Sequence, residues 1–166
     1  MIEIIAAAAA VLGDQLFKKW IVKVFTGMPA EHTRRVIPGV IHLTYVENRG
    51  ASFGMLKGFG WLFLAIAAAF AVLVIWALLK KRLKNPLSRW AAAAVMAGAV
   101  GNAIDRITRG YVVDMFETEF VRFAVFNIAD IFITLGGIAF CVWLIWEETR
   151  KKKSGSPDEN TEDKSE

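Results

Sequence analysis

The feature that most constrains this fold is an uninterrupted apolar run. Residues 59–79 contain no charged side chain. About 20 apolar residues are enough to cross the hydrocarbon core of a bilayer as a helix. The whole chain of 166 residues is 55% hydrophobic with a mean hydropathy of +0.43, which is too apolar for an ordinary soluble domain of this size. We therefore expect a membrane protein.

Three further segments extend the pattern. Residues 126–146 carry Asp130 as their one charged residue, and residues 90–104 are rich in Ala, Val and Gly. Residues 2–24 are apolar but interrupted by Asp14, Gln15, Lys18 and Lys19. This first segment lacks the basic start and the small-residue cleavage site of a signal peptide, so we read it as a retained helix. The prediction is an all-α membrane domain over residues 1–153, with four spans at about 2–24, 59–79, 88–107 and 126–147.

Basic residues indicate the orientation of these spans. One dense cluster lies at 80–89, between the second and third spans, and another at 150–153 follows the fourth. Basic loops next to spans favour the cytoplasmic side, so we expect both termini in the cytoplasm. Because both clusters flank spans, contact with anionic lipid is favoured over nucleic-acid binding. The polar, acidic residues 154–166 are predicted to form a disordered tail.

The opposite side of the membrane receives two connecting segments. In the first, at about 25–58, the residues "VIHLTYV" alternate as a strand does, and a turn sequence stands on each side. An open sheet edge cannot face hydrocarbon, so we expect a small periplasmic β-element at the membrane surface. Whether residues 25–57 close over a site as a lid is left open. The second segment, 106–125, is read as a short loop that contains Asp114.

Each of the last two spans carries a stripe of small and polar residues. The stripe on the third span consists of Gly98, Gly101, Asn102 and Asp105. The stripe on the fourth consists of Asn127, Asp130, Thr134, Gly137 and Cys141. Helical spacing puts the members of each stripe on one face, and small residues let helices approach closely. We expect the two stripes to face each other, with Cys141 buried as a small apolar residue.

Two carboxylates then fall near one face of the membrane. Asp130 lies at the start of the fourth span and Asp114 in the preceding connection. Ionisable residues within spans usually mark a functional site. Two carboxylates that share a poorly solvated site cannot both ionise easily, which provides one base and one acid, as an aspartic peptidase requires. Which of the two holds the proton is left open, because such a pair titrates as a unit.

Five short sequences, in order along the chain, carry a family resemblance. They are "DQLFKK" (14–19), "ENRGASFG" (47–54), "GAVGNAIDR" (98–106), "VVDMF" (112–116) and "FNIAD" (126–130). On a frame of four spans, they make the chain resemble the lipoprotein signal peptidases, or signal peptidases II, which are intramembrane aspartic peptidases of bacteria. Each sequence alone is weak evidence, and the ordered set is strong. One departure is Ser52, where the family pattern leads us to expect alanine.

The resemblance implies an activity and a set of site residues. Asp114 and Asp130 would form a catalytic dyad that removes signal peptides from prolipoproteins, on the amino side of a diacylglyceryl-modified cysteine. The implied substrate-binding residues are Asn48, Gly50, Asn102, Arg106 and Asn127. Supporting roles fall to Asp14, Lys18 and Asp105, with Asp14 paired to Lys18 at i,i+4 and Asp105 beside Arg106.

The resemblance also bears on surroundings and partners. It implies the cytoplasmic (inner) membrane, a site near the periplasmic face, and no metal or other cofactor. The expected partners are the lipidated prolipoprotein and membrane lipid, without nucleic acid. Nothing in the sequence requires more than a monomer.

Three other functions fit parts of the sequence. A serine peptidase is suggested by G-x-S-x-G at 50–54 with Ser52 and the upstream His42, but that motif needs an α/β sheet that this chain does not provide. A metallopeptidase lacks H-E-x-x-H, although Asp and Asn side chains can hold Mg²⁺ or Ca²⁺. A small ion-coupled carrier also uses intramembrane carboxylates, but no inverted repeat is visible, and the carboxylates lie at one face instead of the midplane.

Overall fold

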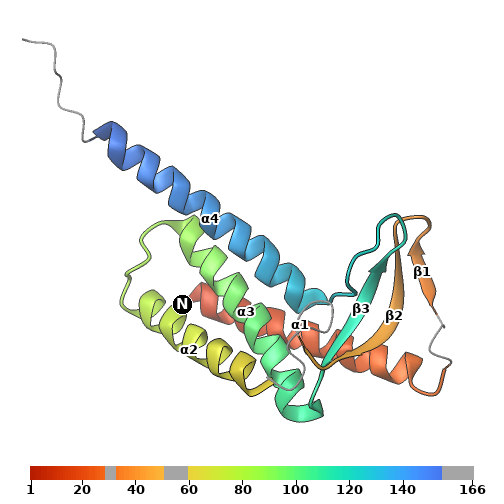
Figure 1. Cartoon of the computed structure of the whole chain (residues 1–166). Coiled ribbons are helices and arrows are strands. Elements are labelled where there is room, and N and C mark those ends of the chain that lie inside the picture. Colours follow the sequence, from red (N-terminus) through yellow and green to blue (C-terminus); the bar gives the residue numbers. More distant parts are fainter. Residues whose placement is uncertain (29–32, 51–59, 155–166) are drawn as a thin grey trace, which may run out of the picture.

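The computed structural model describes residues 1–28, 33–50 and 60–154. Its helices are α1 (Ile2–Phe25), α2 (Gly60–Leu79), α3 (Pro86–Arg109) and α4 (Ile128–Ser154). Its strands are β1 (Arg34–Ile37), β2 (Ile41–Asn48) and β3 (Val112–Thr118). The helices pack together at one end and the sheet lies beyond them at the other (Figure 1). The predicted tail 154–166 starts one residue too early, because Ser154 ends α4, and its residues 155–166 lie outside the described residues. Residues 29–32 and 51–57 of the suggested lid lie outside them as well.

Helix α3 shows how local sequence sets its boundaries. Asn85 caps its start by accepting a hydrogen bond at Oδ1 from the Leu87 backbone N–H at 2.8 Å, and Pro86 fills the first helical position. Gly110 ends the helix with a left-handed backbone (φ 79°), which favours glycine because it has no Cβ. The helix is longer than the predicted span 88–107 at both ends.

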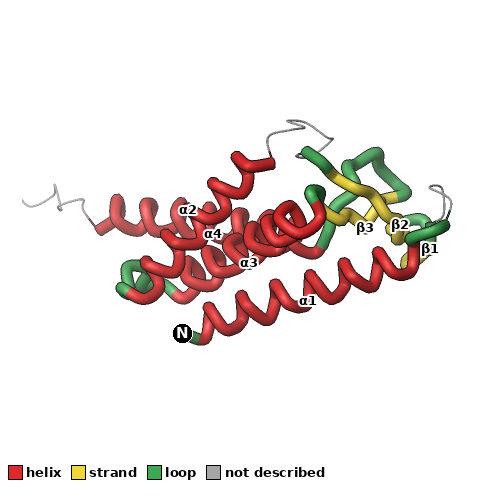
Figure 2. Tube along the Cα trace, turned by 90° about the horizontal axis from the view of Figure 1, so that it is seen from below, coloured by secondary structure: helices red, strands yellow, loops and turns green. Residues whose placement is uncertain are grey.

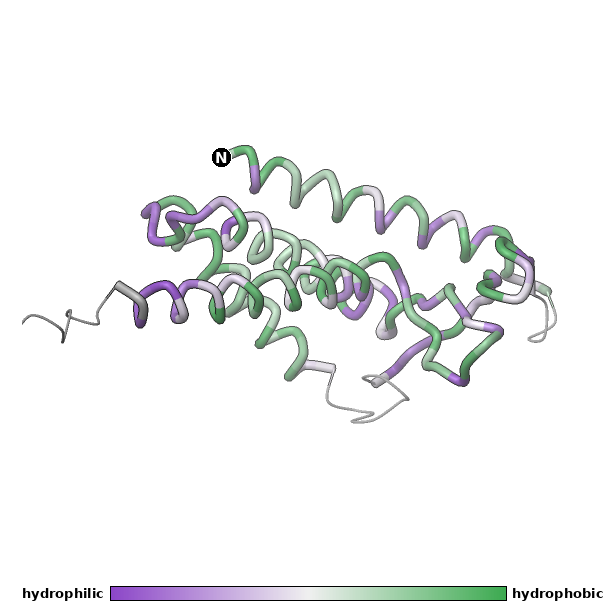
Figure 3. Tube along the Cα trace, turned by 90° about the horizontal axis from the view of Figure 1, so that it is seen from above, coloured by the Kyte–Doolittle hydropathy of each residue, from purple (hydrophilic) through white to green (hydrophobic). Residues whose placement is uncertain are grey.

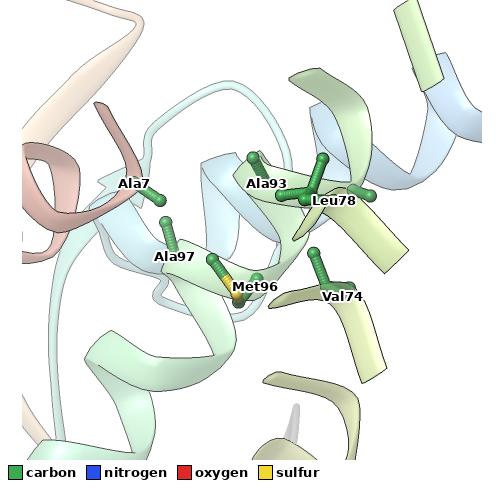
Figure 4. Packing of buried hydrophobic residues seen from close by; sticks show 7 residues of the cluster. Ala7, Val74, Leu78, Ala93, Met96 and Ala97 are labelled. Carbon is green, nitrogen blue, oxygen red and sulfur yellow. The ribbon is translucent and has the colours of Figure 1, made fainter. Parts of the chain in front are cut away.

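Helix α3 is also the centre of the bundle. It packs against α1, α2 and α4, and its buried residues include Ala91, Ala92, Ala93 and Ala97. Ala93, Met96 and Ala97 meet Ala7 of α1 and Val74 of α2 in one apolar cluster (Figure 4). Small side chains on α3 allow three neighbouring helices to approach it closely.

The contact between α3 and α4 corrects one prediction. On α4 it is Ala129, Ile133 and Gly136 that face α3, and a Cβ on Gly136 would come within 2.9 Å of the Ala91 carbonyl oxygen. Gly137 has open space where its side chain would be, and Cys141 is exposed. The predicted stripe on α4 therefore turns away from α3 after its first turn, because the closest packing lies one residue earlier around the helix.

The sheet is antiparallel with the order β1-β2-β3, and only its central strand was predicted. Within β2 the expected alternation fails, since Leu43 and Thr44 are both buried beside a register shift between Leu43 and Val46. Such an irregularity changes which side chains face the core. The segment that contains Asp114, read as a loop, is strand β3.

Helix α1 joins the two halves of the molecule. Its second half extends past the other helices and runs beneath the sheet (Figure 2). There Ile21 and Phe25 pack with Leu43, Val113 and Met115 in a second apolar cluster. This contact fixes β3 against α1.

Two of the described helices are long and apolar enough to cross a membrane by length and composition: α2 (Gly60–Leu79) and Ile128–Lys152 of α4. Figure 3 shows hydrophobic residues along the helices, with hydrophilic residues at the α2–α3 connection and toward the end of α4. Helices α1 and α3 do not meet this measure. Charged residues interrupt α1, and α3 is less hydrophobic because alanine and glycine replace larger side chains where neighbours surround it.

Candidate active site

Asp114 lies on β3 with its side chain almost fully buried, at 2% exposure. Each carboxylate oxygen accepts one amide hydrogen bond. Asn48 Nδ2 donates to Oδ2 at 2.9 Å, and Asn127 Nδ2 donates to Oδ1 at 2.6 Å. Asn48 comes from the paired strand β2, where it lies opposite Val112, so the sheet itself aligns this donor with the carboxylate.

Asp130 lies in the first turn of α4, in a capping box. The Asn127 side chain accepts from the Asp130 backbone N–H at 2.9 Å, and the Asp130 side chain accepts from the Asn127 backbone N–H at 3.2 Å. Such reciprocal bonds satisfy two N–H groups that a helix start leaves unpaired. The second oxygen, Oδ1, accepts from Asn102 Nδ2 at 2.8 Å. A carboxylate at a helix N-terminus is also favoured by the helix dipole.

A short backbone pairing brings the two aspartates together. Phe126 pairs with Phe116 of β3: the Phe126 N–H donates to the Phe116 carbonyl at 3.1 Å, and the Phe116 N–H donates back at 2.8 Å. The chain therefore returns alongside β3 just before α4 begins. As a result Asn127 contacts Asp114 through its side-chain amide and Asp130 through its backbone.

Both carboxylates line one cavity of about 470 Å³. Four of the five predicted substrate-binding residues also line it: Asn48, Gly50, Asn102 and Arg106. The fifth, Asn127, is fully buried beneath it. The remaining wall is mainly apolar and comes from residues 123–126 and from Ile131, Ile133, Thr134 and Leu135 on α4. A polar floor with an apolar wall suits a ligand that has both a polar reacting group and hydrocarbon.

Arg106 closes one side of the cavity. Its Nη2 donates to the Gly50 carbonyl at 3.0 Å, and its guanidinium lies 4.8 Å from the centre of the Phe63 ring. It therefore links α3 to the end of the β2 segment and to α2. Asp105, which was assigned a supporting role beside Arg106, is bonded to Arg109 and Lys18 instead.

Beneath the cavity, α1 contributes a buried ion cluster. Lys18 Nζ, with no exposed side-chain surface, lies 2.9 Å from Asp14 Oδ2, 3.0 Å from Asp105 Oδ2 and 2.9 Å from Asn102 Oδ1. The predicted i,i+4 pair of Asp14 and Lys18 is confirmed. Asp14 also accepts from the Ala129 backbone N–H at 3.0 Å, so it adds a further cap to α4.

Burial raises the pKa of Asp114 to about 6. The hydrogen bond from Asn48 opposes this shift, the charge of Asp130 adds to it, and the hydrogen bond from Asn127 opposes it. With a pKa near 6, both the protonated and the ionised form of Asp114 are populated close to neutral pH. Asp114 can therefore give or take a proton during a reaction.

Sequence reasoning found the polar residues of this site and missed how they are joined. The bridging position of Asn127 depends on the pairing of Phe126 with Phe116, which no sequence pattern announced. Gln15 was also missed as part of the network, where its Nε2 donates to Asp105 Oδ1 at 3.2 Å and to the Gly101 carbonyl at 3.1 Å. The available signals were a polar side chain within an apolar segment and its place inside the motif 14–19.

The residues of the other hypotheses lie elsewhere. Ser52 falls outside the described residues. His42 is hydrogen-bonded to Glu117 at 2.9 Å on the sheet, and it is not among the residues that line the cavity. Within the part of the chain that the structure describes, no three His, Cys, Asp or Glu residues form a group suited to a metal ion.

The fold and site together define a class of protein. The fold matches two solved structures, each titled as a bacterial membrane enzyme structure. One has a TM-score of 0.78 with 29% identity and covers 99% of this chain and 94% of the other. The second has a TM-score of 0.74 with 33% identity and covers 86% and 91%. The chain thus has the architecture of a helical membrane enzyme with a small antiparallel sheet.

The particular family follows from the sequence comparisons. The signal peptidase (SPase) II family matches residues 6–146. A lipoprotein signal peptidase of Lactococcus lactis is 35% identical over 154 residues, or 91% of this chain and 98% of that protein. Another, of Symbiobacterium thermophilum, is 43% identical over 143 residues, or 84% and 92%. This chain belongs to the signal peptidase II family, as its motifs predicted.

Proposed function

We propose that this protein is an aspartic endopeptidase of the bacterial inner membrane that removes signal peptides from prolipoproteins. Membership of the signal peptidase II family supports the substrate class. The observation that carries the mechanism is that Asp114 and Asp130 line one cavity and share Asn127 as a common partner.

The reaction uses one water and both carboxyl groups. The ionised aspartate takes a proton from the water, whose oxygen attacks the scissile carbonyl. The protonated aspartate donates to the carbonyl oxygen and stabilises the developing negative charge. Collapse of the tetrahedral intermediate breaks the C–N bond and returns a proton to the leaving amine. Donors from Asn48, Asn102 and Asn127 hold the carboxylate oxygens in place during these steps.

The cavity suggests how the substrate is held. We place the scissile peptide over Asp114 and Asp130, with cleavage on the amino side of a diacylglyceryl-modified cysteine. Arg106 and the Gly50 backbone border the polar part of the cavity and orient the peptide. The apolar wall from Phe123 and Leu135 accommodates lipid chains.

We also propose that all four helices cross the membrane, with residues 1–153 as one domain acting as a monomer. Exposed apolar side chains on α1, such as Leu12 at 60% and Leu16 at 57%, support a lipid-facing surface on that helix. The N-terminus, the α2–α3 connection and the end of α4 lie at the end of the bundle away from the sheet (Figure 3). With the basic clusters in the cytoplasm, both termini are cytoplasmic and the site faces the periplasm.

The sheet then rests at the membrane surface. Apolar side chains are exposed at its outer end, where the Glu119 N–H donates to the Val40 carbonyl at 3.0 Å. These side chains are Val36, Ile37, Val40, Phe120 and Val121. Exposed Arg34 and Arg35 lie beside them. Apolar residues flanked by arginine suit the boundary between acyl chains and phosphate headgroups.

A cleavage assay on a lipidated prolipoprotein in detergent tests the function. Wild type, Asp114→Asn and Asp130→Asn are compared on gels, each with its fold checked by circular dichroism. We expect cleavage by wild type only. Near wild-type cleavage by either folded variant would show that the dyad is assigned wrongly. Absence of cleavage by folded wild type would remove the proposed substrate class.

Matched controls separate the other mechanisms. Ser52→Ala is expected to cleave at the wild-type rate, and complete loss would restore the serine hypothesis. Activity is expected to survive a chelator, whereas loss that Mg²⁺ or Ca²⁺ reverses would indicate a metal. Ion-coupled solute uptake into vesicles without a cleavage product would favour the carrier.

A further inference from the structure

The orientation of the Asn102 amide is set by Lys18. The Lys18 ammonium has three N–H donors and no acceptor, and its three partners are oxygens of Asp14, Asp105 and Asn102 at 2.9, 3.0 and 2.9 Å. Of the two ends of the Asn102 amide, only the oxygen can accept a hydrogen bond from the ammonium. The Asn102 NH₂ group must therefore point the other way, where it donates to Asp130 Oδ1 at 2.8 Å.

The same orientation extends to the second aspartate. Asn102 Oδ1 accepts a second hydrogen bond, from Asn127 Nδ2 at 3.2 Å. That same Nδ2 donates to Asp114 Oδ1 at 2.6 Å. Hence the chain of contacts that starts at Lys18 passes through two amides and ends on both carboxylates. If the Asn102 amide turned over, its NH₂ would face the ammonium and the Asn127 NH₂, and Asp130 would face an oxygen.

The charges around Lys18 show why it can lie in this place. Asp14 and Asp105 supply two negative charges, and Lys18 with Arg109, which is bonded to Asp105, supplies two positive ones. A buried ammonium is tolerated when it is paired and hydrogen-bonded. An ion pair with Asp14 would balance the charge of the Lys18 ammonium. It would not require the additional hydrogen bond to Asn102.

We propose that Lys18 is a positioning residue for the catalytic pair: its ammonium fixes the Asn102 amide, and through it the donor arrangement on Asp130 and Asp114. This inference rests on the proposed function for its kinetic consequence. Lys18 is not among the residues that line the cavity, and its side chain has no exposed surface. It acts through Asn102 and Asn127, by holding their amide donors within hydrogen-bond distance of Asp130 and Asp114.

A double-mutant cycle tests this coupling. Lys18→Met, Asn102→Ala and the double variant are compared in prolipoprotein cleavage, with Lys19→Met, at the exposed neighbouring position, as the matched control. We expect Lys18→Met to lower kcat on the order of 100-fold with KM within about threefold, because small misplacements at a reacting centre have effects of that size. If Lys18 acts through Asn102, the double variant is no slower than Asn102→Ala alone. Losses that multiply, or an unchanged kcat in Lys18→Met, would overturn the proposal.

Lys18→Met leaves buried carboxylates without their cation, which can cause misfolding. A second comparison therefore uses a double variant in which one charge of each sign is removed. Asp14→Asn is compared with Asp14→Asn/Lys18→Met, which removes one charge of each sign. An ion pair with no other role predicts similar kcat in the two variants, and that result would overturn the proposal. A further loss on the order of 100-fold in the double variant supports it.

A readout without cleavage separates this inference from the proposed function. The chain has five asparagines, so ¹⁵N-asparagine labelling in detergent gives few side-chain NH₂ signals. We expect Lys18→Met to move the Asn102 and Asn127 signals while those of Asn85 stay in place. Unmoved Asn102 signals in folded Lys18→Met would contradict the inference. If wild type does not cleave prolipoprotein, the proposed function fails while the NMR result still decides the role of Lys18.

Discussion

Two pairs of carboxylates lie in neighbouring parts of this molecule and differ in their partners. Asp14 and Asp105 are bonded to the cations of Lys18 and Arg109. The charges of this first pair are therefore balanced within the protein. Such a cluster satisfies its buried charges with partners from the protein itself.

The second pair, Asp114 and Asp130, receives its hydrogen bonds from amide groups of Asn48, Asn102 and Asn127. Amides orient a carboxylate without neutralising it. This pair also lines the cavity, whereas Asp14 and Asp105 do not. The comparison teaches that the partners, more than the aspartates themselves, separate a structural pair from a reactive one.

The largest expected effect comes from changing the cavity pair. Asp130→Asn should lower prolipoprotein cleavage at least about 10³-fold, because Asp114 alone cannot supply both the base that activates water and the acid that protonates the carbonyl oxygen. The detergent-solubilised fold should persist, since an asparagine can still accept one hydrogen bond at the start of α4. The cleavage rate tests the loss of activity, and circular dichroism tests whether the fold persists. A variant that unfolds instead would make Asp130 a structural residue like Asp105.

The matching change in the balanced pair, Asp105→Asn, should lower stability and leave most of the cleavage activity. Asp105→Asn removes the charge partner of Arg109 and one of the two carboxylates bonded to Lys18, and it weakens the acceptor of the Val113 N–H, which is bonded at 3.1 Å. Breaking a buried pair costs about 3–5 kcal/mol of stability. Thermal unfolding in detergent should show this loss, while the folded fraction should keep cleavage within about tenfold of wild type. Loss of cleavage at unchanged stability would erase the distinction between the pairs.

The pH dependence of stability sharpens the comparison further. Because the pKa of Asp114 is raised to about 6 from an ordinary 3.8, the folded protein binds this proton more tightly than the unfolded chain does. Ionised Asp114 thus destabilises the fold above pH 6, by about 3 kcal/mol at most, and this penalty fades as pH falls from 6 toward 4. Asp114→Asn should therefore raise the melting temperature at pH 7 more than at pH 4. An equal effect at both values would contradict the raised pKa.

The smallest expected effects test the packing beneath the two pairs. A Cβ on Gly101 would come within 2.8 Å of Asp14 Oδ2, so Gly101→Ala should destabilise by about 1–3 kcal/mol. Gly137 has open space at the same position, and Gly137→Ala should be neutral or stabilise by up to about 1 kcal/mol through helix propensity. Melting temperatures of the two variants measure the difference. Equal values would mean that α1 can move away from α3 at no cost.

Much of the site was readable from the sequence because its residues stand in short motifs on helices. The i,i+4 spacing of Asp14 and Lys18 predicted an ion pair, and the periodic face of α3 predicted that Asn102 and Asp105 point inward. The family was identified from the same motifs. Strand β3 was missed, because its apolar stretch around Asp114 was too short to separate from a loop.

The sequence by itself determined the apolar helices, their approximate bounds and the identities of the polar residues, because hydropathy and helical periodicity are local properties. Only the tertiary structure decided which polar residues meet. The return of Phe126 alongside Phe116 brings Asn127 between Asp114 and Asp130, and it joins positions ten residues apart by backbone hydrogen bonds. The partners of Lys18 on α3 likewise depend on how α1 crosses that helix. Contacts between distant segments depend on the packing of whole elements, which local patterns do not encode.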